Sequence, residues 1–112
     1  MSNKDLRDRF EYRARIMKAL GHSSRLFIVH ELRHSECSVH ELTSMIGSDI
    51  STVSKHLSVL REAGIVDYRK EGARMLYFLA APCVLDFFDC LERLVQTNLQ
   101  RRSIAGLEHL KS

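Results

Sequence analysis

The chain is poor in several features that mark other classes of protein. It has one proline, no tryptophan and three cysteines among 112 residues, and no apolar run approaches the length that crosses a membrane. An odd number of scattered cysteines argues against a disulfide framework and leaves thiols or metal ligands. The first twenty residues are crowded with charged side chains, unlike a secretory signal, so we expect a cytoplasmic protein with no membrane partner.

The chain also has only a small excess of positive over negative charge. The formal net charge is +3, which is too mild to establish a nucleic-acid partner by itself. The excess lies in residues 1–20, where a solvated helix surface and a phosphate-facing role are both open. No glycine-rich phosphate loop and no nucleophile elbow is present in the sequence, so an enzyme is disfavoured.

What the chain does have is apolar periodicity. Apolar residues at three- and four-residue steps predict a first helix over residues 4–20, which Gly21 stops. A second helix is expected over residues 25–33, capped by Ser23 or Ser24. The length and the 45% hydrophobic content allow one globular domain with a modest core.

A short third helix and a fourth helix follow, joined by a tight turn. Ser38 is placed to cap the third helix, with Glu41 at the capping-box position. Residues 47–49 make the turn, and the fourth helix begins near Ser51 and ends at Gly64. The fourth helix has one apolar face and one polar face. Such a pair fits the helix-turn-helix unit, whose second helix enters the major groove of DNA.

After the fourth helix the apolar period changes to two. It predicts a β-hairpin over residues 65–79 with a glycine-bearing tip at 71–73, and then a last helix after Pro82. The last helix is apolar over more than half of its circumference, so it needs two partners. Residues 101–112 are small and polar and are expected to form a frayed tail.

Hydroxyl and basic side chains gather on the polar face of the fourth helix and at the hairpin tip. Such donors can approach phosphates and base edges, provided that the acidic residues nearby turn away from the phosphates. The predicted DNA-binding residues are Ser51, Thr52, Ser54, Lys55, His56, Ser58, Arg69, Lys70 and Arg74.

Three segments of the sequence resemble the ArsR/SmtB family of winged helix-turn-helix repressors. They are Ala-Leu-Gly-His-Ser-Ser-Arg-Leu at 19–26, Cys-Ser-Val-His-Glu-Leu at 37–42, and the run at 51–66 that contains Leu-Arg-Glu-Ala-Gly. The resemblance covers about residues 4–100 and implies a mainly α fold with a small β-hairpin. Residues 1–100 would then form one winged-helix domain for DNA binding and dimerisation. The resemblance further implies recognition of double-stranded operator DNA by the fourth helix, and release of that DNA when an inducer binds.

The apolar surface of the first and last helices exceeds what one small monomer can bury, so a two-fold contact between copies is expected. The predicted homodimer interface consists of Leu6, Phe10, Val84, Phe88, Leu91 and Val95.

The inducer sites of the family match this sequence poorly. Metal-sensing members begin the third helix with Cys-Val-Cys. The matching positions of this chain are Ser38-Val39-His40, and Cys37 is displaced from them by one residue. The zinc pattern of the last helix is matched only by Asp86, so a zinc site of that type is not expected.

Other sensor groups remain. The candidates for a sensor or metal site are Cys37, His40, Cys83 and Cys90. Within one helix, Cα atoms of residues 83 and 90 would lie about 10.5 Å apart, too far for a disulfide. We therefore expect a repressor that answers to a thiophilic metal, a metalloid or a thiol-reactive compound, and otherwise no cofactor. A DNA-binding regulator without a switch and a winged-helix protein-interaction module are the alternatives.

Overall fold

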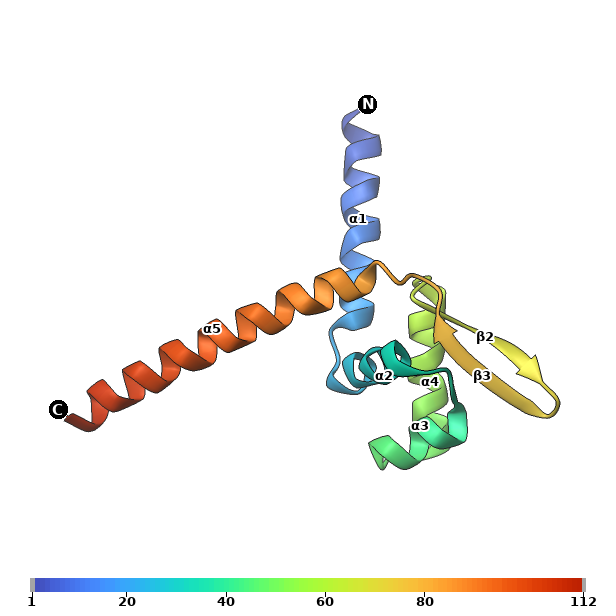
Figure 1. The fold of residues 1–112 in the computed structure, drawn as a ribbon. Coiled ribbons are helices and arrows are strands. Elements are labelled where there is room, and N and C mark those ends of the chain that lie inside the picture. The colour runs from blue at the N-terminus through green and yellow to red at the C-terminus, as the bar shows by residue number, and fades with distance from the viewer. Residues whose placement is uncertain (1, 112) are drawn as a thin grey trace. The chain divides into compact units, whose positions relative to one another are not determined.

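The computed structural model describes residues 2–111, and the side chains of residues 2–103. The chain divides into two compact units, Met1–Pro82 and Cys83–Ser112. The first unit contains four helices and a small sheet, and the second contains one helix (Figure 1). Over the described residues, no helix combines the length and the apolar content needed to span a bilayer.

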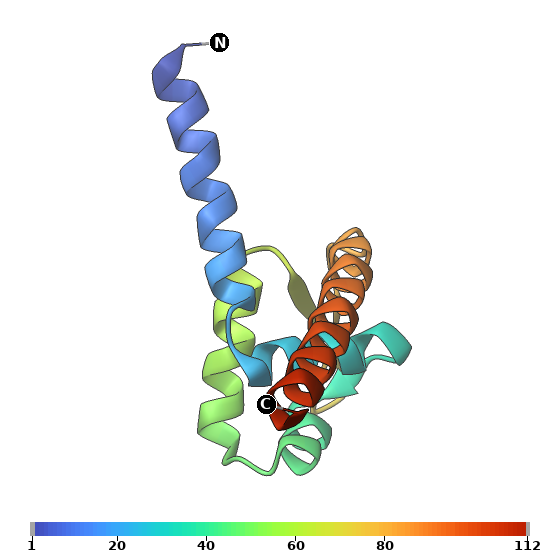
Figure 2. The ribbon, with the colours of Figure 1, turned by 90° about the vertical axis from the view of Figure 1, so that its left-hand side faces the viewer.

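The first unit opens with helices α1 (Asn3–Leu20) and α2 (Ser23–His34). Only Ala19 and Leu20 of α1 are buried, and Figure 2 shows most of that helix extending away from the rest of the unit. The predicted serine cap of α2 was wrong. His22 has extended backbone angles and its imidazole Nδ1 accepts the Ser24 N–H at 3.1 Å, because both serines already lie inside the helix.

Helices α3 (Val39–Ile46) and α4 (Ile50–Glu62) form the helix-turn-helix. The predicted capping box at the start of α3 is confirmed. The turn contains Gly47 in the left-handed conformation, with φ of 78°, where a residue with a Cβ atom would be strained. Asp49 caps α4, so that helix begins at Ile50, one position earlier than predicted.

The sheet has three antiparallel strands in the order β1-β3-β2. Strands β2 (Val66–Glu71) and β3 (Arg74–Leu79) form the predicted hairpin, whose turn lies at its free end (Figure 1). Strand β1 (Cys37–Ser38) was not predicted. It pairs with β3 so that Cys37 lies opposite Tyr77, and it attaches the start of α3 to the hairpin.

The core lies where α2, α3 and α4 meet the sheet. Its fully buried side chains come from all of these elements, and the predicted apolar face of α4 is among them. The largest are Ile28, Val29, Leu42, Val53, Leu57, Leu60 and Val66. Burial of this face fixes the rotation of α4 about its axis and thereby decides which of its side chains face solvent.

Helix α5 (Val84–Lys111) makes up the second unit. The expected polar tail over residues 101–112 is helical as far as Lys111. The sequence explains the difference, because after Pro82 it contains no further proline and a single glycine, Gly106, which costs about 1 kcal/mol. Polarity alone does not end a helix.

Candidate nucleic-acid interface

The solvent-facing side of α4 carries the predicted reading residues. Ser51, Lys55 and Ser58 are exposed and follow one another at steps of four and three, so they share one side of the helix. Thr52 and Ser54 are half-buried beside them. This polar side is opposite the apolar face that packs in the core, and these five side chains lie together on it.

The first turn of α4 carries its own negative charge. The Asp49 carboxylate accepts the Thr52 N–H at 2.7 Å and the Ser51 hydroxyl at 3.0 Å. These hydrogen bonds, the Thr52 N–H first, lower the pKa of Asp49, and the nearby Lys55 charge adds to the effect. The carboxylate is therefore ionised at neutral pH, and the Ser51 hydroxyl is already engaged before any ligand arrives.

His56 lies in a different environment from the other predicted residues of α4. Its ring is half-buried, with its centroid 4.4 Å from that of His22. Its Nδ1 accepts a hydrogen bond of 3.4 Å from the Arg25 guanidinium, which also donates from Nε to the Ala19 carbonyl. Burial, followed by the charges of His22 and Arg25, lowers the pKa of His56. His56 thus connects α4 to the junction between α1 and α2 as a neutral imidazole.

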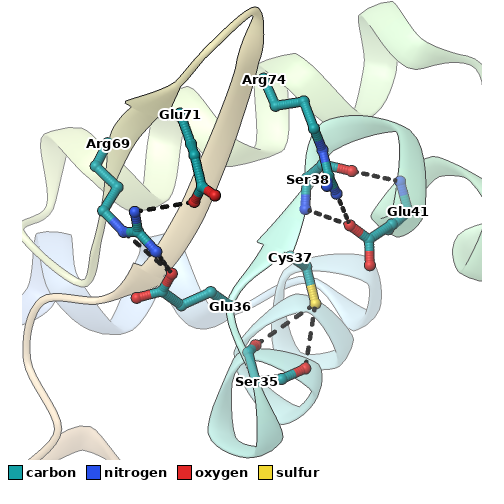
Figure 3. Close-up of polar contacts among 8 residues, drawn as sticks. All are labelled: Ser35, Glu36, Cys37, Ser38, Glu41, Arg69, Glu71 and Arg74. Atoms are coloured by element: carbon teal, nitrogen blue, oxygen red, sulfur yellow. Dashed lines mark hydrogen bonds and ion pairs between the residues drawn. The ribbon is translucent and has the colours of Figure 1, made fainter.

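The two arginines of the hairpin are paired with carboxylates (Figure 3). Arg69 contacts Glu36 at 2.6 Å and Glu71 at 3.1 Å, and Arg74 contacts Glu41 at 2.6 Å. All five side chains are substantially exposed, so solvent screens these pairs and phosphate oxygens can compete for the guanidinium groups.

Lys70 differs from the two arginines. It is exposed, and among the described side chains no carboxylate lies within ion-pairing distance of it. It is therefore the basic residue of the hairpin whose charge is most directly available. The sequence indicated that acidic residues lie near the basic ones. It did not identify Glu36 and Glu41 as the partners of the two arginines, because each pair joins residues 33 positions apart.

The sensor candidates divide between the two units, with Cys37 and His40 in the first and Cys83 and Cys90 in the second. Cys37 is buried with 3% of its surface exposed, and its thiol donates to the Ser35 carbonyl at 3.5 Å (Figure 3). Burial is the main reason that the pKa of Cys37 is raised, which keeps it a protonated and unreactive thiol. His40, Cys83 and Cys90 are exposed. Within the described part of the chain, no three His, Cys, Asp or Glu side chains gather as metal ligands would.

The donor chemistry at the start of α3 also does not fit the Cys-Val-Cys metal site that the sequence resemblance implies. Ser38 stands at one of the two thiolate positions, and its buried hydroxyl accepts the Glu41 N–H at 3.1 Å. The Glu41 carboxylate accepts the Ser38 N–H in return and also binds Arg74. A hydroxyl used as a helix cap is a poor substitute for a thiolate toward a soft metal.

A helix-turn-helix followed by a hairpin with a basic tip defines a winged helix-turn-helix protein. Comparison with known proteins agrees, because the profile of the family described as "Bacterial regulatory protein, arsR family" matches residues 22–68. The uncharacterized HTH-type transcriptional regulator Rv0081 of Mycobacterium tuberculosis is 34% identical over 104 residues, covering 92% of this chain and 90% of that protein. The biofilm growth-associated repressor of Xylella fastidiosa is 39% identical over 79 residues, covering 70% and 69% of the two chains.

A solved structure shows the same fold. The homodimeric winged helix-turn-helix DNA-binding domain of Mb0332 from Mycobacterium bovis matches with a TM-score of 0.80 and 28% identity, covering 90% of this chain and 93% of that one. The chain belongs to the arsR family of bacterial regulatory proteins. It is a DNA-binding transcriptional regulator rather than an enzyme.

Proposed function

We infer that the protein is a homodimeric repressor that works in the cytoplasm and binds operator DNA through α4 and the β2–β3 wing. The observation that carries this inference is the two-sided character of α4. One side is locked into the core, and the opposite side presents Ser51, Lys55 and Ser58 to solvent. A helix fixed in this way offers hydroxyl and ammonium donors to a groove without having to rearrange.

The dimer is supported by exposed apolar side chains on α1 and α5. Phe10 is 56% exposed and Val95 is 46% exposed, and the Mycobacterium bovis domain is described as homodimeric. A two-fold contact would remove such side chains from water in pairs and would place two copies of α4 about one helical turn of DNA apart. Repression is proposed because the Xylella fastidiosa relative is named a repressor.

Salt-dependent binding tests the interface. The probe is an operator duplex selected from random-sequence DNA by the purified protein, and the readout is fluorescence anisotropy over a series of salt concentrations. Lys55→Ala and Lys70→Ala should each weaken binding and reduce the slope of log affinity against log salt by about one, since each removes a phosphate contact.

Lys4→Ala is the matched control, because it removes the same charge from the first turn of α1. It should leave the slope close to that of the parent protein. If Lys55→Ala and Lys70→Ala bind as the parent does, the interface has been placed on the wrong surface.

For the inducer we infer a thiol-directed signal that acts through Cys83 and Cys90. Both thiols are exposed, whereas Cys37 is buried and protonated. His40 is exposed on α3, but the cysteine nearest to it in the sequence, Cys37, is buried. A thiophilic ion or an oxidant in solution therefore meets the two cysteines of the second unit first.

The test is operator release by Zn²⁺, Cd²⁺, arsenite and a thiol oxidant. The variant with both Cys83→Ser and Cys90→Ser should lose the response, and Cys37→Ser and His40→Gln should keep it. If none of these compounds releases operator DNA from the parent protein, the chain is a regulator without a thiol switch.

A further inference from the structure

Two histidines of α2 take no part in the interface or in the thiol switch. His30 and His34 are both exposed and lie one helical turn apart on the same face. Residues 30–34 read His-Glu-Leu-Arg-His, the spacing in which two imidazoles of one helix bind a single metal ion. This spacing is the signal in the sequence that points to the pair, and the DNA-binding prediction makes no use of it.

The separation of the two rings fits a shared ion. The ring centroids lie 5.3 Å apart and the ring planes are nearly perpendicular, at 81°. With Zn–N distances of about 2.0–2.1 Å, two imidazoles on one tetrahedral ion have centroids roughly 5 Å apart. Because both side chains are exposed, small rotations can aim one nitrogen of each ring at a common point.

The nitrogens of this pair are also available. Among the described residues, each ring contacts the other ring, and no nitrogen of either ring is engaged in a hydrogen bond. His34 stands in the last turn of α2, where the free carbonyl groups give the helix end a partial negative charge that favours a cation, and His30 lies one turn before it.

The other histidine pair of the unit provides an internal comparison. His22 and His56 are closer, at 4.4 Å between centroids, but Nδ1 of each ring is already an acceptor, from Ser24 and from Arg25 respectively. The Arg25 guanidinium also repels a cation there. Of these two pairs, only His30 and His34 therefore suit a metal ion.

We propose that His30 and His34 form a two-histidine site for a divalent transition-metal ion such as Zn²⁺ or Cu²⁺, with water in the remaining coordination positions. Imidazole nitrogen is a preferred ligand of both ions. Glu31, which separates the pair in the sequence, has its charge close enough to the Cys37 thiol to raise the pKa of that thiol. The site is one of metal binding.

Zinc titration of the full chain tests the site without DNA, so its outcome is independent of the proposed interface. Zn²⁺ is added to the protein while the imidazole resonances are followed by ¹H–¹³C NMR, and calorimetry gives the affinity. One ion per chain should shift the His30 and His34 resonances together. His30→Gln and His34→Gln should each weaken this binding by at least about tenfold, since a chelate becomes a single ligand.

His40→Gln is the matched control, because it removes an exposed histidine that has no imidazole partner one turn away. It should show the parent's Zn²⁺-induced shifts at His30 and His34. The variant with Cys83→Ser and Cys90→Ser, which removes the thiols proposed to meet thiophilic ions, should show the same shifts at these two rings. The proposal is overturned if the parent shows no shift at these two rings, or if both His→Gln variants of the pair keep the parent's affinity. Circular dichroism checks that each variant is folded, which is expected for exposed positions.

Discussion

The guanidinium group of Arg69 is shared between two carboxylates, and this sharing governs how much of its charge the wing can offer to DNA. Glu36 approaches it at 2.6 Å and Glu71 at 3.1 Å, and both side chains are largely exposed. These carboxylates hold the pKa of Arg69 above its usual range, mainly through the hydrogen bond that Arg69 donates to Glu36. Phosphate must displace them before Arg69 can contact DNA.

Glu36→Gln should therefore strengthen operator binding. The substitution removes the closer carboxylate charge and leaves Arg69 free to contact a phosphate, so the slope of log affinity against log salt should steepen by up to about one. Glu11→Gln on α1 makes the same change in net charge far along the chain from the wing, and it should leave the slope unchanged. Equal effects of the two substitutions would show that only net charge matters.

The imidazole of His56 makes the stability of the fold depend on pH. Burial first, and then His22 and Arg25, lower its pKa below the ordinary value of 6.5 in the folded protein. The unfolded chain therefore binds a proton at a higher pH than the folded one does. The contribution to stability is complete above about pH 6.5 and is lost as the pH falls through the lowered folded-state pKa.

Urea unfolding at neutral pH and at about pH 5 should show this loss. Most of the stabilised carboxylates still keep their charge at the lower pH, since the pKa values of Asp49, Asp67 and Glu41 are lowered. His56→Gln should narrow the difference between the two conditions, whereas His40→Gln at an exposed position should not. An unchanged difference in the His56 variant would assign the pH dependence to other groups.

At the level of elements, the reciprocal cap at the start of α3 links the helix-turn-helix to the wing. The Ser38 hydroxyl accepts the Glu41 N–H, and the Glu41 carboxylate accepts the Ser38 N–H and the Arg74 guanidinium. Ser38 also belongs to β1, opposite Leu76 of β3. One short segment thus both fixes the beginning of a helix and pairs with the middle of β3.

Ser38→Ala should lower the free energy of unfolding by about 1 kcal/mol, as loss of a helix cap does. The measurement is urea denaturation with the slope checked for constancy. Ser44→Ala is the control, because Ser44 is exposed in the middle of the same helix and alanine is a better helix former there. A Ser38 variant as stable as the parent would mean that water replaces the cap.

The elements that could be predicted are those whose signals are local. The capping box of α3 depends on Ser38 and Glu41 three residues apart, and the polar side of α4 follows from apolar spacing within that helix. Strand β1 escaped prediction because its two residues gain their partners only when Leu76 and Tyr77 arrive from the hairpin. No pattern within Cys37–Ser38 itself signals a strand.

The same distinction applies to the candidate interface. The donors on α4 could be predicted from their periodicity. The pairing of Glu36 with Arg69 and of Glu41 with Arg74 could not, because each of these two pairs joins residues 33 positions apart. The position of His56 beside Arg25 likewise depends on how α4 packs near the junction of α1 and α2. A single sequence does not fix such packing.

At the scale of the whole molecule, the exposed apolar side chains favour a homodimer, in which a second copy of the chain would cover them. On α5, Leu94 is 55% exposed, Val95 46% and Leu99 58%, and on α1 Phe10 is 56% exposed. Val95→Glu should reduce the sedimentation mass at micromolar concentration from two chains to one, because a carboxylate in an apolar two-fold contact would be buried twice. Val95→Ile keeps the apolar character and should remain dimeric. A monomeric parent would reject the homodimer.

The reactivity of the Cys37 thiol reports how often the three-stranded sheet opens. Cys37 belongs to β1, which pairs with β3, and it is 3% exposed, whereas Cys83 and Cys90 are exposed. A chromogenic thiol reagent should therefore react quickly with two sulfurs and slowly with the third, at a rate set by how often β1 detaches. Unfolding in urea should make all three react at similar rates. The slow phase then measures, without any substitution in the chain, how operator DNA or a metal ion alters the lifetime of the closed fold.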